Sequence, residues 1–276
     1  MNRERVGICG WILDRADAPA SVEQAAAMGF AAVQVGFFTA EAVRGADPAK
    51  ILSLADRLGV RIVSVFAAFE REDFASIAHI AASSGYMSDE EWAHRLEMTR
   101  LVGDIAVEVG CPSVAVHAGT VPVDAASADR AKLCGRVRQA ADMLAESNLR
   151  LLLETGRESA GDLRDFVDTV GVSNVGVNFD PGNFVVYGAD DPVRAVTTLK
   201  GLIDIVHVKD ARASAAPGTE FGSPASLGSG DANIPRVLSK LRIIGFDGPL
   251  LVEENTRVLG MDAVPAAAAY LRSMLD

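Results

Sequence analysis

The most regular feature of this chain is a series of short apolar runs, separated by longer stretches in which apolar and polar residues are mixed. The runs are rich in Val, Ile and Leu and lack the strict alternation of a half-exposed strand. Each is therefore predicted to be a β-strand that is covered on both faces. The strands are predicted to start near residues 6, 32, 61, 113, 150, 175, 203 and 249.

Six of these strands follow the same pattern, a helical stretch that ends in a glycine and is followed within a few residues by the apolar run. The pattern recurs as MGFAAVQV, LGVRIVSV, VGCPSVAV, VGVSNVGVNF, KGLIDIVHV and IGFDGPLLV. Alternating helices and buried strands are typical of a parallel sheet, and eight such strands close into a barrel of roughly 250 residues. We therefore predict an α/β fold, a single (βα)8 TIM barrel in which residues 1–276 form one domain.

Four helix starts carry capping signals. Ser88 and Glu91 have the spacing of a capping box and predict one of them. Asp47 and Asp191 each precede a proline. The aspartate can accept backbone amide hydrogens of the first turn, and the proline occupies a position where no hydrogen bond is lost. Ser21 and Gln24 have the spacing of a capping box and predict a helix that starts at Ser21.

Two connections are longer than the 4 to 6 residues, roughly, that are usual in compact domains. They run from Phe69 to Met87 and from Arg212 to Asn233, and both follow a strand. We expect them to cover the carboxyl ends of the strands, where barrel enzymes hold their sites, and to be more mobile than the barrel. The second contains Gly228 and Gly230, which we interpret as a loop turn rather than a phosphate-binding loop.

Composition and charge narrow the classes of function. Hydrophobic residues make up 49% of the chain and charged residues 23%, and no apolar segment is long enough to cross a membrane. The net charge of -11 disfavours a nucleic-acid partner, because nucleic-acid binding depends on clustered Lys and Arg. Three cysteines without metal-ligand or redox spacing suit a reducing compartment, so we predict a soluble cytoplasmic protein that binds a small molecule. A homodimer is compatible with this sequence.

Four of the predicted strands end in side chains that can bind a metal. These side chains are Glu154, Asp180, His207, and either Glu253 or Glu254. Since neighbouring residues of a strand face opposite sides of the sheet, only one of the last two can point inward. Carboxylates and an imidazole that converge at one end of a barrel predict a single divalent cation, Mn²⁺, Mg²⁺ or Zn²⁺. The alternative for any one of these acids is a buried ion pair with Arg157 or Lys209.

Further polar residues follow the same strands. His117 ends the fourth strand and is predicted to face the substrate, although a hydrogen-bonded structural role is equally compatible. Lys209 could steady developing negative charge if it points inward, or lie on the surface if it points outward. Arg157 and Glu158 are placed to contact substrate hydroxyl groups. The sequence has no GxSxG elbow and no P-loop, so it gives little support to nucleophilic catalysis.

The motifs LLLETGRE, NFDPGN, HVKDA, LGSGD and GFDGPLLVEEN resemble the sugar phosphate isomerase/epimerase family. This is a group of xylose-isomerase-like barrels that includes ketohexose 3-epimerases, inosose dehydratases and endonuclease IV. The resemblance implies a divalent metal held by Glu154, Asp180, His207 and Glu253. It also implies that Glu154 and Glu253 take and return a proton at the substrate carbon between two metal-bound oxygens.

The sequence departs from two branches of that family. Asn183 stands where the ketohexose epimerases have a histidine that touches the substrate. It can donate a hydrogen bond to a sugar hydroxyl but cannot act as an acid at neutral pH. The additional histidines of the three-metal cluster in endonuclease IV are missing near Ala67, Asn183 and Asp231. DNA repair is therefore disfavoured.

We hypothesise that the protein is a divalent-metal-dependent isomerase or epimerase acting on a sugar or related polyol ketone by glutamate-mediated proton transfer. Two alternatives stay open. A dehydratase of a cyclic keto-polyol would start from the same proton abstraction and then lose water. A barrel that binds a metal or a sugar without catalysis would keep the ligands and need no second base.

Overall fold

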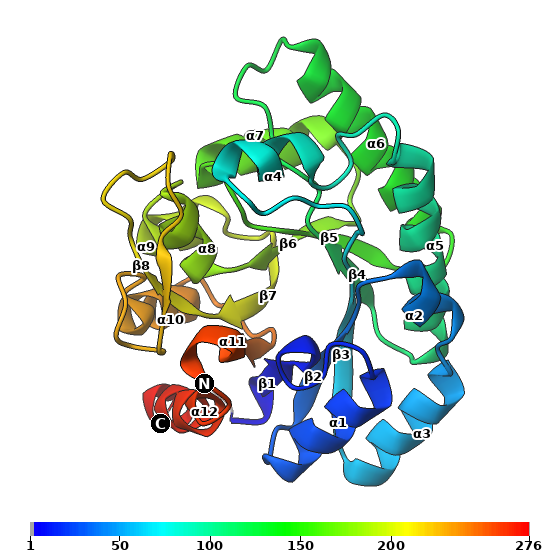
Figure 1. Cartoon of the computed structure of the whole chain (residues 1–276), viewed down its shortest axis with the longest axis vertical. Coiled ribbons are helices and arrows are strands. Elements are labelled where there is room, and N and C mark those ends of the chain that lie inside the picture. Colours follow the sequence, from blue (N-terminus) through cyan, green and yellow to red (C-terminus); the bar gives the residue numbers. More distant parts are fainter. Residues whose placement is uncertain (1–2, 276) are drawn as a thin grey trace.

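The computed structural model describes residues 3–275 and contains a closed barrel of eight parallel strands (Figure 1). The barrel strands follow one another in sequence order, and the last pairs with the first, so the predicted (βα)8 TIM barrel is confirmed. All eight predicted strand starts lie within one residue of the observed ones. The barrel strands are β1 (Val6–Cys9), β2 (Ala32–Phe37), β3 (Arg61–Ala67), β4 (Ser113–Val116), β5 (Arg150–Glu154), β6 (Val175–Phe179), β7 (Ile203–Val208) and β10 (Leu250–Val252).

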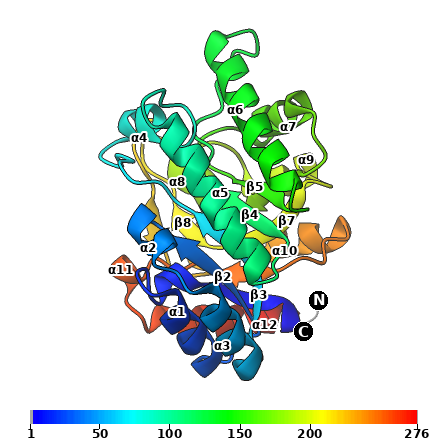
Figure 2. The same cartoon turned by 90° about the vertical axis from the view of Figure 1, so that its right-hand side faces the viewer.

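Helices surround the barrel as an outer layer, as Figures 1 and 2 show. One main helix follows each barrel strand: α1 (Ala18–Ala27), α3 (Pro48–Leu58), α5 (Trp92–Glu108), α6 (Ala128–Ala145), α7 (Ala160–Val170), α9 (Pro192–Thr198), α10 (Ile234–Ile243) and α12 (Ala263–Leu275). Shorter elements lie in the connections: η1 (Arg3–Arg5), η2 (Gly10–Ile12), α2 (Ala40–Arg44), α4 (Ile77–Ser83), α8 (Pro181–Tyr187), α11 (Thr256–Leu259), and the hairpin of β8 (Asp210–Arg212) with β9 (Ser223–Ala225). Within residues 3–275, no helix combines the length and apolarity that a membrane span requires.

The turns that lead into the strands explain the repeated glycine pattern. Gly59 and Gly171 end their helices with φ angles of 67° and 69°, a left-handed conformation that glycine adopts without steric cost. The turn before β5 has no glycine in the sequence, and there Asn148 adopts a φ of 58°. Asparagine tolerates this conformation better than most residues. The same backbone turn therefore precedes β5, although the glycine pattern does not mark it.

Two of the four predicted helix starts, those at Asp47 and Asp191, are confirmed. Asp47 accepts a hydrogen bond from the backbone of the first turn of α3, and Asp191 does the same for α9. The helix predicted to start at Ser88 begins at Trp92 instead, although Ser88 Oγ accepts the Glu91 amide at 3.3 Å. The prediction for Ser21 is wrong, because α1 starts at Ala18 and its N-cap is Asp17, which accepts from the Ala20 amide. Ser21 lies within the helix, where its hydroxyl donates to the Ala18 carbonyl.

The core has two layers. Between the strands and helices lies a large apolar layer that includes Leu151, Leu153, Val206 and Leu250. Inside the barrel, a smaller cluster is formed by Cys9, Ala32, Val63, Phe66, Ala115, Leu152, Ile205 and Leu251. Because successive residues of a strand point to opposite faces, this apolar plug also fixes which residues of each strand point inward at its carboxyl end.

The connection after β3 lies over one side of the barrel mouth and is anchored to β4 and α5. Tyr86 donates its amide hydrogen to the Ala118 carbonyl at 2.8 Å. The buried Arg95 of α5 donates to the carbonyls of Ser83 and Gly85. Gly85 has a φ of 61°, and a Cβ added there would lie 2.0 Å from the backbone of Ala118 and Gly119. No other residue fits this close backbone contact.

Contrary to the prediction, the connection after β7 does not line the barrel mouth. It forms the β8–β9 hairpin and packs against α8, where Gly222 donates to the Val186 carbonyl at 2.7 Å and Gly218 to that of Tyr187 at 3.1 Å. Gly228 and Gly230 form a turn around a side chain of the protein itself. Their amides donate to Asp210 Oδ2 at 3.0 and 2.9 Å, so they are not available to bind phosphate.

The contact at Gly85 makes a stability prediction. Gly85→Ala should lower the free energy of unfolding by about 2 to 4 kcal/mol, because the new methyl group combines left-handed strain with a backbone clash. Gly110→Ala is the matched control, because its φ is 72° but no atom lies within 4 Å of an added Cβ. It should cost only about 1 to 2 kcal/mol. Denaturant unfolding of both variants checks this, and equal losses would show that the backbone contact is unimportant.

Candidate metal centre

Four side chains that can bind a metal lie close together at the mouth of the barrel, at or just beyond the ends of strands. Glu154, His207 and Glu253 each lie two residues beyond an apolar residue that points inward, namely Leu152, Ile205 and Leu251. The two-residue period of a strand therefore turns them inward as well. Asp180 directly follows β6 and caps α8. One ligand atom from each of Glu154, Asp180, His207 and Glu253 lies within 4.8 Å of those of the other three.

His207 is at the centre of this group and is fully buried. Its Nδ1 lies 3.2 Å from Glu154 Oε1 and 3.2 Å from Glu253 Oε2, whereas its Nε2 lies 2.6 Å from Gln34 Oε1. A hydrogen on Nε2 satisfies the contact with Gln34 and leaves the Nδ1 lone pair directed at the space between the carboxylates. Without a cation, the imidazole of His207 favours its protonated form. Burial opposes this protonation, but Cys9, Glu154 and Glu253 hold the pKa of His207 well above its ordinary value.

Asp180 is the most strongly desolvated carboxylate of the group. Its Oδ1 accepts the Asn183 amide at 3.0 Å, while its Oδ2 accepts no hydrogen bond from any residue in the described chain. The nearest cation is the Lys209 ammonium, 3.3 Å from Oδ2. Burial raises the pKa of Asp180 to about 7, and the negative charges of Glu253 and Glu154 act in the same direction, against Lys209.

Each of the two glutamates has one carboxylate oxygen in this group, while its other oxygen contacts a separate side chain. Glu154 Oε2 lies 3.0 Å from His117 Nε2. Glu253 Oε1 accepts a hydrogen bond from Trp11 Nε1 at 3.1 Å. Burial opposes ionisation of both, but His117 and His207 lower the pKa of Glu154, and Lys209 and His207 lower that of Glu253. Both glutamates are therefore ionised at neutral pH.

Lys209 and Asn183 complete the polar layer above the group. Lys209 points inward, and its Nζ lies 3.3 Å from Glu253 Oε2 and 3.3 Å from Asn183 Oδ1. Asn183 donates to the Thr155 carbonyl at 3.0 Å and to Glu154 Oε1 at 3.3 Å. Both side chains therefore contact the acids directly, and both can donate hydrogen bonds to an oxygen-rich ligand.

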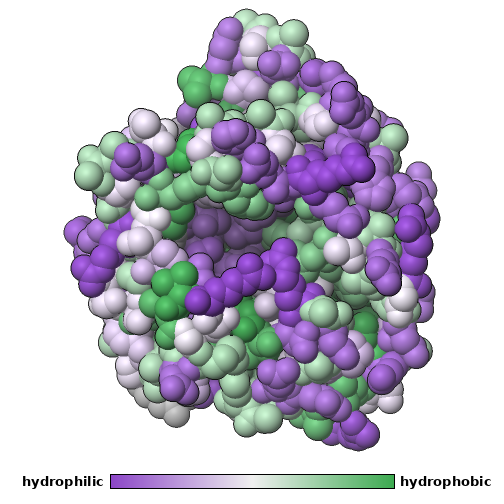
Figure 3. Space-filling view, in the orientation of Figure 1, coloured by the Kyte–Doolittle hydropathy of each residue, from purple (hydrophilic) through white to green (hydrophobic). Residues whose placement is uncertain are grey.

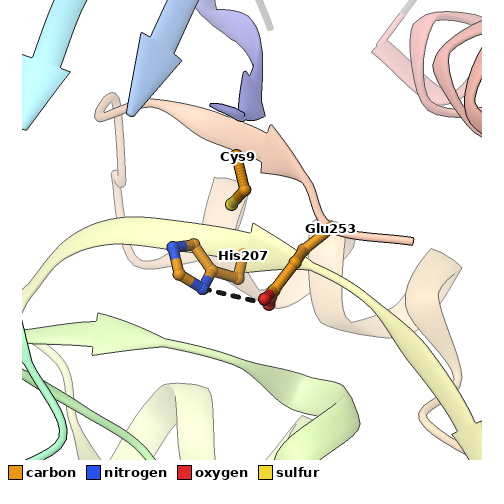
Figure 4. Close-up of side chains that lie close together, drawn as sticks. All are labelled: Cys9, His207 and Glu253. Atoms are coloured by element: carbon orange, nitrogen blue, oxygen red, sulfur yellow. Dashed lines mark ion pairs between the residues drawn. The ribbon is translucent and has the colours of Figure 1, made fainter. Parts of the chain in front are cut away.

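Cys9 lies beside His207 and Glu253 and forms a second group that could hold a metal (Figure 4). Burial raises the pKa of this thiol to about 12, so it stays protonated at neutral pH. A thiol is a much weaker ligand than a thiolate. The four-residue group of three carboxylates and one imidazole is therefore the stronger candidate.

The residues of the four-residue group fit a divalent cation. Three buried carboxylates within 4.8 Å of one another repel strongly unless a cation lies between them. Asp180 Oδ2, which accepts no hydrogen bond, and the Nδ1 of His207 are the kinds of ligand atom that Mn²⁺, Mg²⁺ or Zn²⁺ binds. The Gln34 contact supplies the outer hydrogen bond that a metal-bound histidine usually makes.

Two clefts open beside this group, and Figure 3 shows the hollow at the mouth with hydrophilic side chains along its rim. The first, which we name the His117 cleft, is lined by Glu72, Phe74, Ile80, Ser84, His117, Ala118, Gly119, Thr120, Glu154, Gly156, Arg157, Glu158 and Tyr187. The second, which we name the arginine cleft, is lined by Trp11, Ile12, Arg15, Lys209, Glu253, Glu254, Asn255, Thr256 and Arg257.

The His117 cleft is lined by further residues that were predicted from the sequence to contact the substrate. His117 and Glu158 line it, and Arg157 donates to Thr120 Oγ1 at 3.0 Å rather than to Glu154. Burial raises the pKa of Glu158, and it also raises that of Glu72 from the connection after β3. The connection 69–87 therefore lies over the site as predicted, and it contributes a carboxyl group.

Two acids beside the group accept hydrogen bonds from backbone amides and do not belong to the metal centre. Glu254 points outward, and its Oε1 accepts the Leu227 amide at 2.9 Å. Glu253 is therefore the inward residue of the pair. Asp210 accepts four backbone amides, those of Ala211, Gly228, Gly230 and Ala232.

Several residues of the centre were not predicted from the sequence. Gln34 and Asn178 contact the ring of His207, and Trp11 holds Glu253. Gln34 and Asn178 each interrupt an apolar strand, in AVQV and VGVNF. A polar side chain on the inward face of a buried strand was the signal that could have found both.

The cation hypothesis predicts different effects for two buried aspartates. Asp180→Asn should weaken Mn²⁺ binding by at least about 100-fold, since it removes a charged ligand atom. Asp210→Asn should leave Mn²⁺ affinity unchanged, because Asp210 binds backbone amides outside the group. Titration calorimetry on chelator-treated protein measures both. Equal Mn²⁺ affinities for Asp180→Asn and the wild type would refute the site.

The pKa of Asp180 predicts a pH effect on the metal-free protein. A carboxyl group whose pKa rises from 3.8 to about 7 on folding stabilises the fold fully below the unfolded value. This contribution is lost as the pH rises through 7. In chelator at pH 8, Asp180→Asn should therefore melt above the wild type, and the difference should shrink towards pH 5. Scanning calorimetry is the measurement, and a variant that melts lower at pH 8 would contradict the expected repulsion.

Comparison with known proteins supports this description of the fold. A search of curated proteins finds no significant match. Among solved structures, a xylose isomerase domain protein from Planctomyces limnophilus has 28% identity and a TM-score of 0.87, over 92% of this chain and 91% of that one. A D-tagatose 3-epimerase-like protein has 22% identity and a TM-score of 0.76, over 98% and 96%. A Mycobacterium smegmatis barrel in complex with magnesium has 18% identity and a TM-score of 0.68, over 96% and 90%.

The match of the sequence to a family model covers nearly the whole barrel. Residues 22–274 match the model described as xylose isomerase-like TIM barrel. The closed eight-stranded barrel and the acidic group at its mouth agree with that match. The chain belongs to the xylose isomerase-like TIM barrel family.

Proposed function

We propose that the protein is a divalent-metal-dependent epimerase or isomerase of a sugar or related polyol ketone. The observation that carries the proposal is a pair of glutamates, both with a lowered pKa, in one group that could hold a metal. Similarity to a D-tagatose 3-epimerase-like protein and to a barrel crystallised with magnesium supports it.

The cation would be held by Glu154, Asp180, His207 and Glu253. When bound, it supplies polarisation of the substrate ketone and stabilisation of the negative charge that develops on proton removal. His207 keeps its Nε2 hydrogen on Gln34 and its Nδ1 free for this role. Asp180, anchored by the Asn183 amide, contributes charge without reaching the reacting carbon.

Glu154 and Glu253 are the proton-transferring residues of this proposal. One ionised glutamate would remove the proton from the carbon next to the ketone, and the electron pair would delocalise into the carbonyl. The other glutamate, having first taken up a proton from solvent, would deliver that proton to the opposite face of the same carbon. His117 Nε2 contacts Glu154 Oε2 and is partly exposed to the cleft, so it can exchange that proton with solvent. Trp11 fixes the orientation of Glu253.

Lys209 and Asn183 bind substrate oxygens in this arrangement. The Lys209 ammonium balances one carboxylate charge, and the Asn183 amide donates to a hydroxyl group. His117 and Glu158 face the same substrate from the His117 cleft.

A dehydratase remains a second candidate because of the carboxyl groups in the His117 cleft. Burial raises the pKa of Glu158 and of Glu72, and a carboxyl group that holds its proton can protonate a departing hydroxyl. Proton abstraction by Glu154 or Glu253 followed by such a step would release water. The product of the reaction separates the two candidates, since epimerisation conserves mass and dehydration loses one water.

The proposal predicts which of two adjacent glutamates is required. In deuterated water with Mn²⁺, the wild type should exchange a carbon-bound hydrogen of a ketose for deuterium, detected by proton NMR. Glu253→Gln should slow this exchange by about 10²- to 10⁴-fold, the usual contribution of a general base. Glu254→Gln is the matched control and should keep the wild-type rate, because its Oε1 still accepts the Leu227 amide.

The same experiment tests the alternative of a barrel that binds without catalysis. Exchange that survives Glu253→Gln, or Glu254→Gln slowing it equally, would remove the assigned role of Glu253. A wild type that binds Mn²⁺ and ketoses but exchanges no hydrogen with any of them would favour simple binding.

A further inference from the structure

The arginine cleft shares residues with the metal centre but has no assigned role in the proposed proton transfer. Lys209 and Glu253 line it, and both contact the four-residue group. The cleft has a volume of about 220 Å³ and is open to solvent. A substrate held at the centre can therefore extend one end into it.

Arg15 and Arg257 carry positive charge on the walls of this cleft. Neither guanidinium forms an ion pair with an acid anywhere in residues 3–275. Both line the same cleft, and burial, followed by the charge of Arg257, lowers the pKa of Arg15. Both side chains are exposed, so solvent screens their repulsion, but an anion in the cleft would be attracted by both charges.

The acids nearest to these arginines are already engaged. Glu253 is bound by Trp11 and Lys209, and Glu254 by the Leu227 amide. Asp14, next to Arg15 in the sequence, accepts the amides of Ala16 and Asp17. The hydrogen-bond donors of both arginines are therefore available to a ligand.

The position of Arg15 is fixed by a contact other than charge. The Arg15 guanidinium stacks on the ring of Phe38 at 3.7 Å, and Phe38 in turn packs edge-on against Trp11 at 6.1 Å. Thr256 Oγ1 donates to the Ile12 carbonyl at 3.1 Å and ties the segment after β10 to the segment after β1. A guanidinium group held in this way, like that of Arg15, binds carboxylates and phosphates well, because little side-chain freedom is lost.

The opposite side of the metal centre has different chemistry. In the His117 cleft, Glu72 and Glu158 are buried acids, and Arg157 there is bound by Thr120. Buried carboxyl groups exchange hydrogen bonds with hydroxyls and offer no positive charge to an anion. The two clefts therefore distinguish the ends of a ligand that spans the centre.

We propose that the arginine cleft binds an oxyanion substituent of the substrate, a carboxylate or a phosphate, through Arg15 and Arg257. The inference rests on the proposed function and names its substrate class: an acidic or phosphorylated ketose, with its hydroxyl end in the His117 cleft. The arginines bind and orient the substrate and take no part in the proton transfer.

The test compares three ketoses that differ only at C6: D-fructose, D-fructuronate and D-fructose 6-phosphate. Affinities for the Mn²⁺-loaded protein are measured by calorimetry in 150 mM salt. The wild type should bind at least one of the charged ketoses about 10-fold more tightly than D-fructose, as expected for a charged group bound by two guanidinium groups. Preference for the uronate or the ester identifies the anion.

Two sets of variants make the result specific. The double variant Arg15→Gln/Arg257→Gln should bind all three ketoses equally while retaining Mn²⁺. The control Arg236→Gln removes an exposed arginine beside α9 and should keep the preference. A wild type without a preference for a charged ketose, or a preference that survives the double substitution, overturns the inference.

The outcome is separable from that of the proposed function. An arginine-dependent preference for a charged ketose, without any hydrogen exchange, would refute the epimerase and leave the oxyanion site standing. Exchange into D-fructose that requires Glu253, with no arginine-dependent preference, would do the reverse.

Discussion

The burial of like charges at the mouth of the barrel is the constraint on which the rest of the site depends. Glu154, Asp180 and Glu253 bring three carboxylates within 4.8 Å of one another in a nearly water-free position. Such an arrangement is unfavourable unless positive charge compensates it. Lys209 supplies one charge at the edge of the group, and a divalent cation would supply the two that remain. With His207 neutral, the sum is zero.

The barrel achieves this arrangement through the alternation of its strands rather than through special local structure. The same inward face carries apolar Leu152, Ile205 and Leu251 in the plug and Glu154, His207 and Glu253 one step later. The next residue along the chain points to the opposite side. Glu254 lies on the outer side and accepts the amide hydrogen of a loop residue. The apolar plug therefore gives the polar residues a rigid support, which a catalytic or metal site needs.

Much of this could be predicted from the sequence because the signals were periodic. Buried parallel strands and the turns before them recur, so all eight strand starts were correct, and strand ends indicated which acids converge. The rest depended on tertiary contacts. The Ser21 prediction failed because Asp17, followed by Pro19, provides an earlier cap. The loop with Gly228 folds around Asp210, and Trp11 of η2 donates to Glu253, 242 residues away in sequence. Such pairings arise only when the barrel closes.

The central claim is that the four-residue group holds one divalent ion. Anomalous diffraction from crystals grown with Mn²⁺, recorded at the manganese edge, tests it most directly. We expect a single peak at the barrel mouth, with oxygen or nitrogen atoms of Glu154, Asp180, His207 and Glu253 about 2.0 to 2.4 Å away. Crystals with millimolar Mn²⁺ and no peak at this position, or with a peak bound to other residues, would contradict the claim.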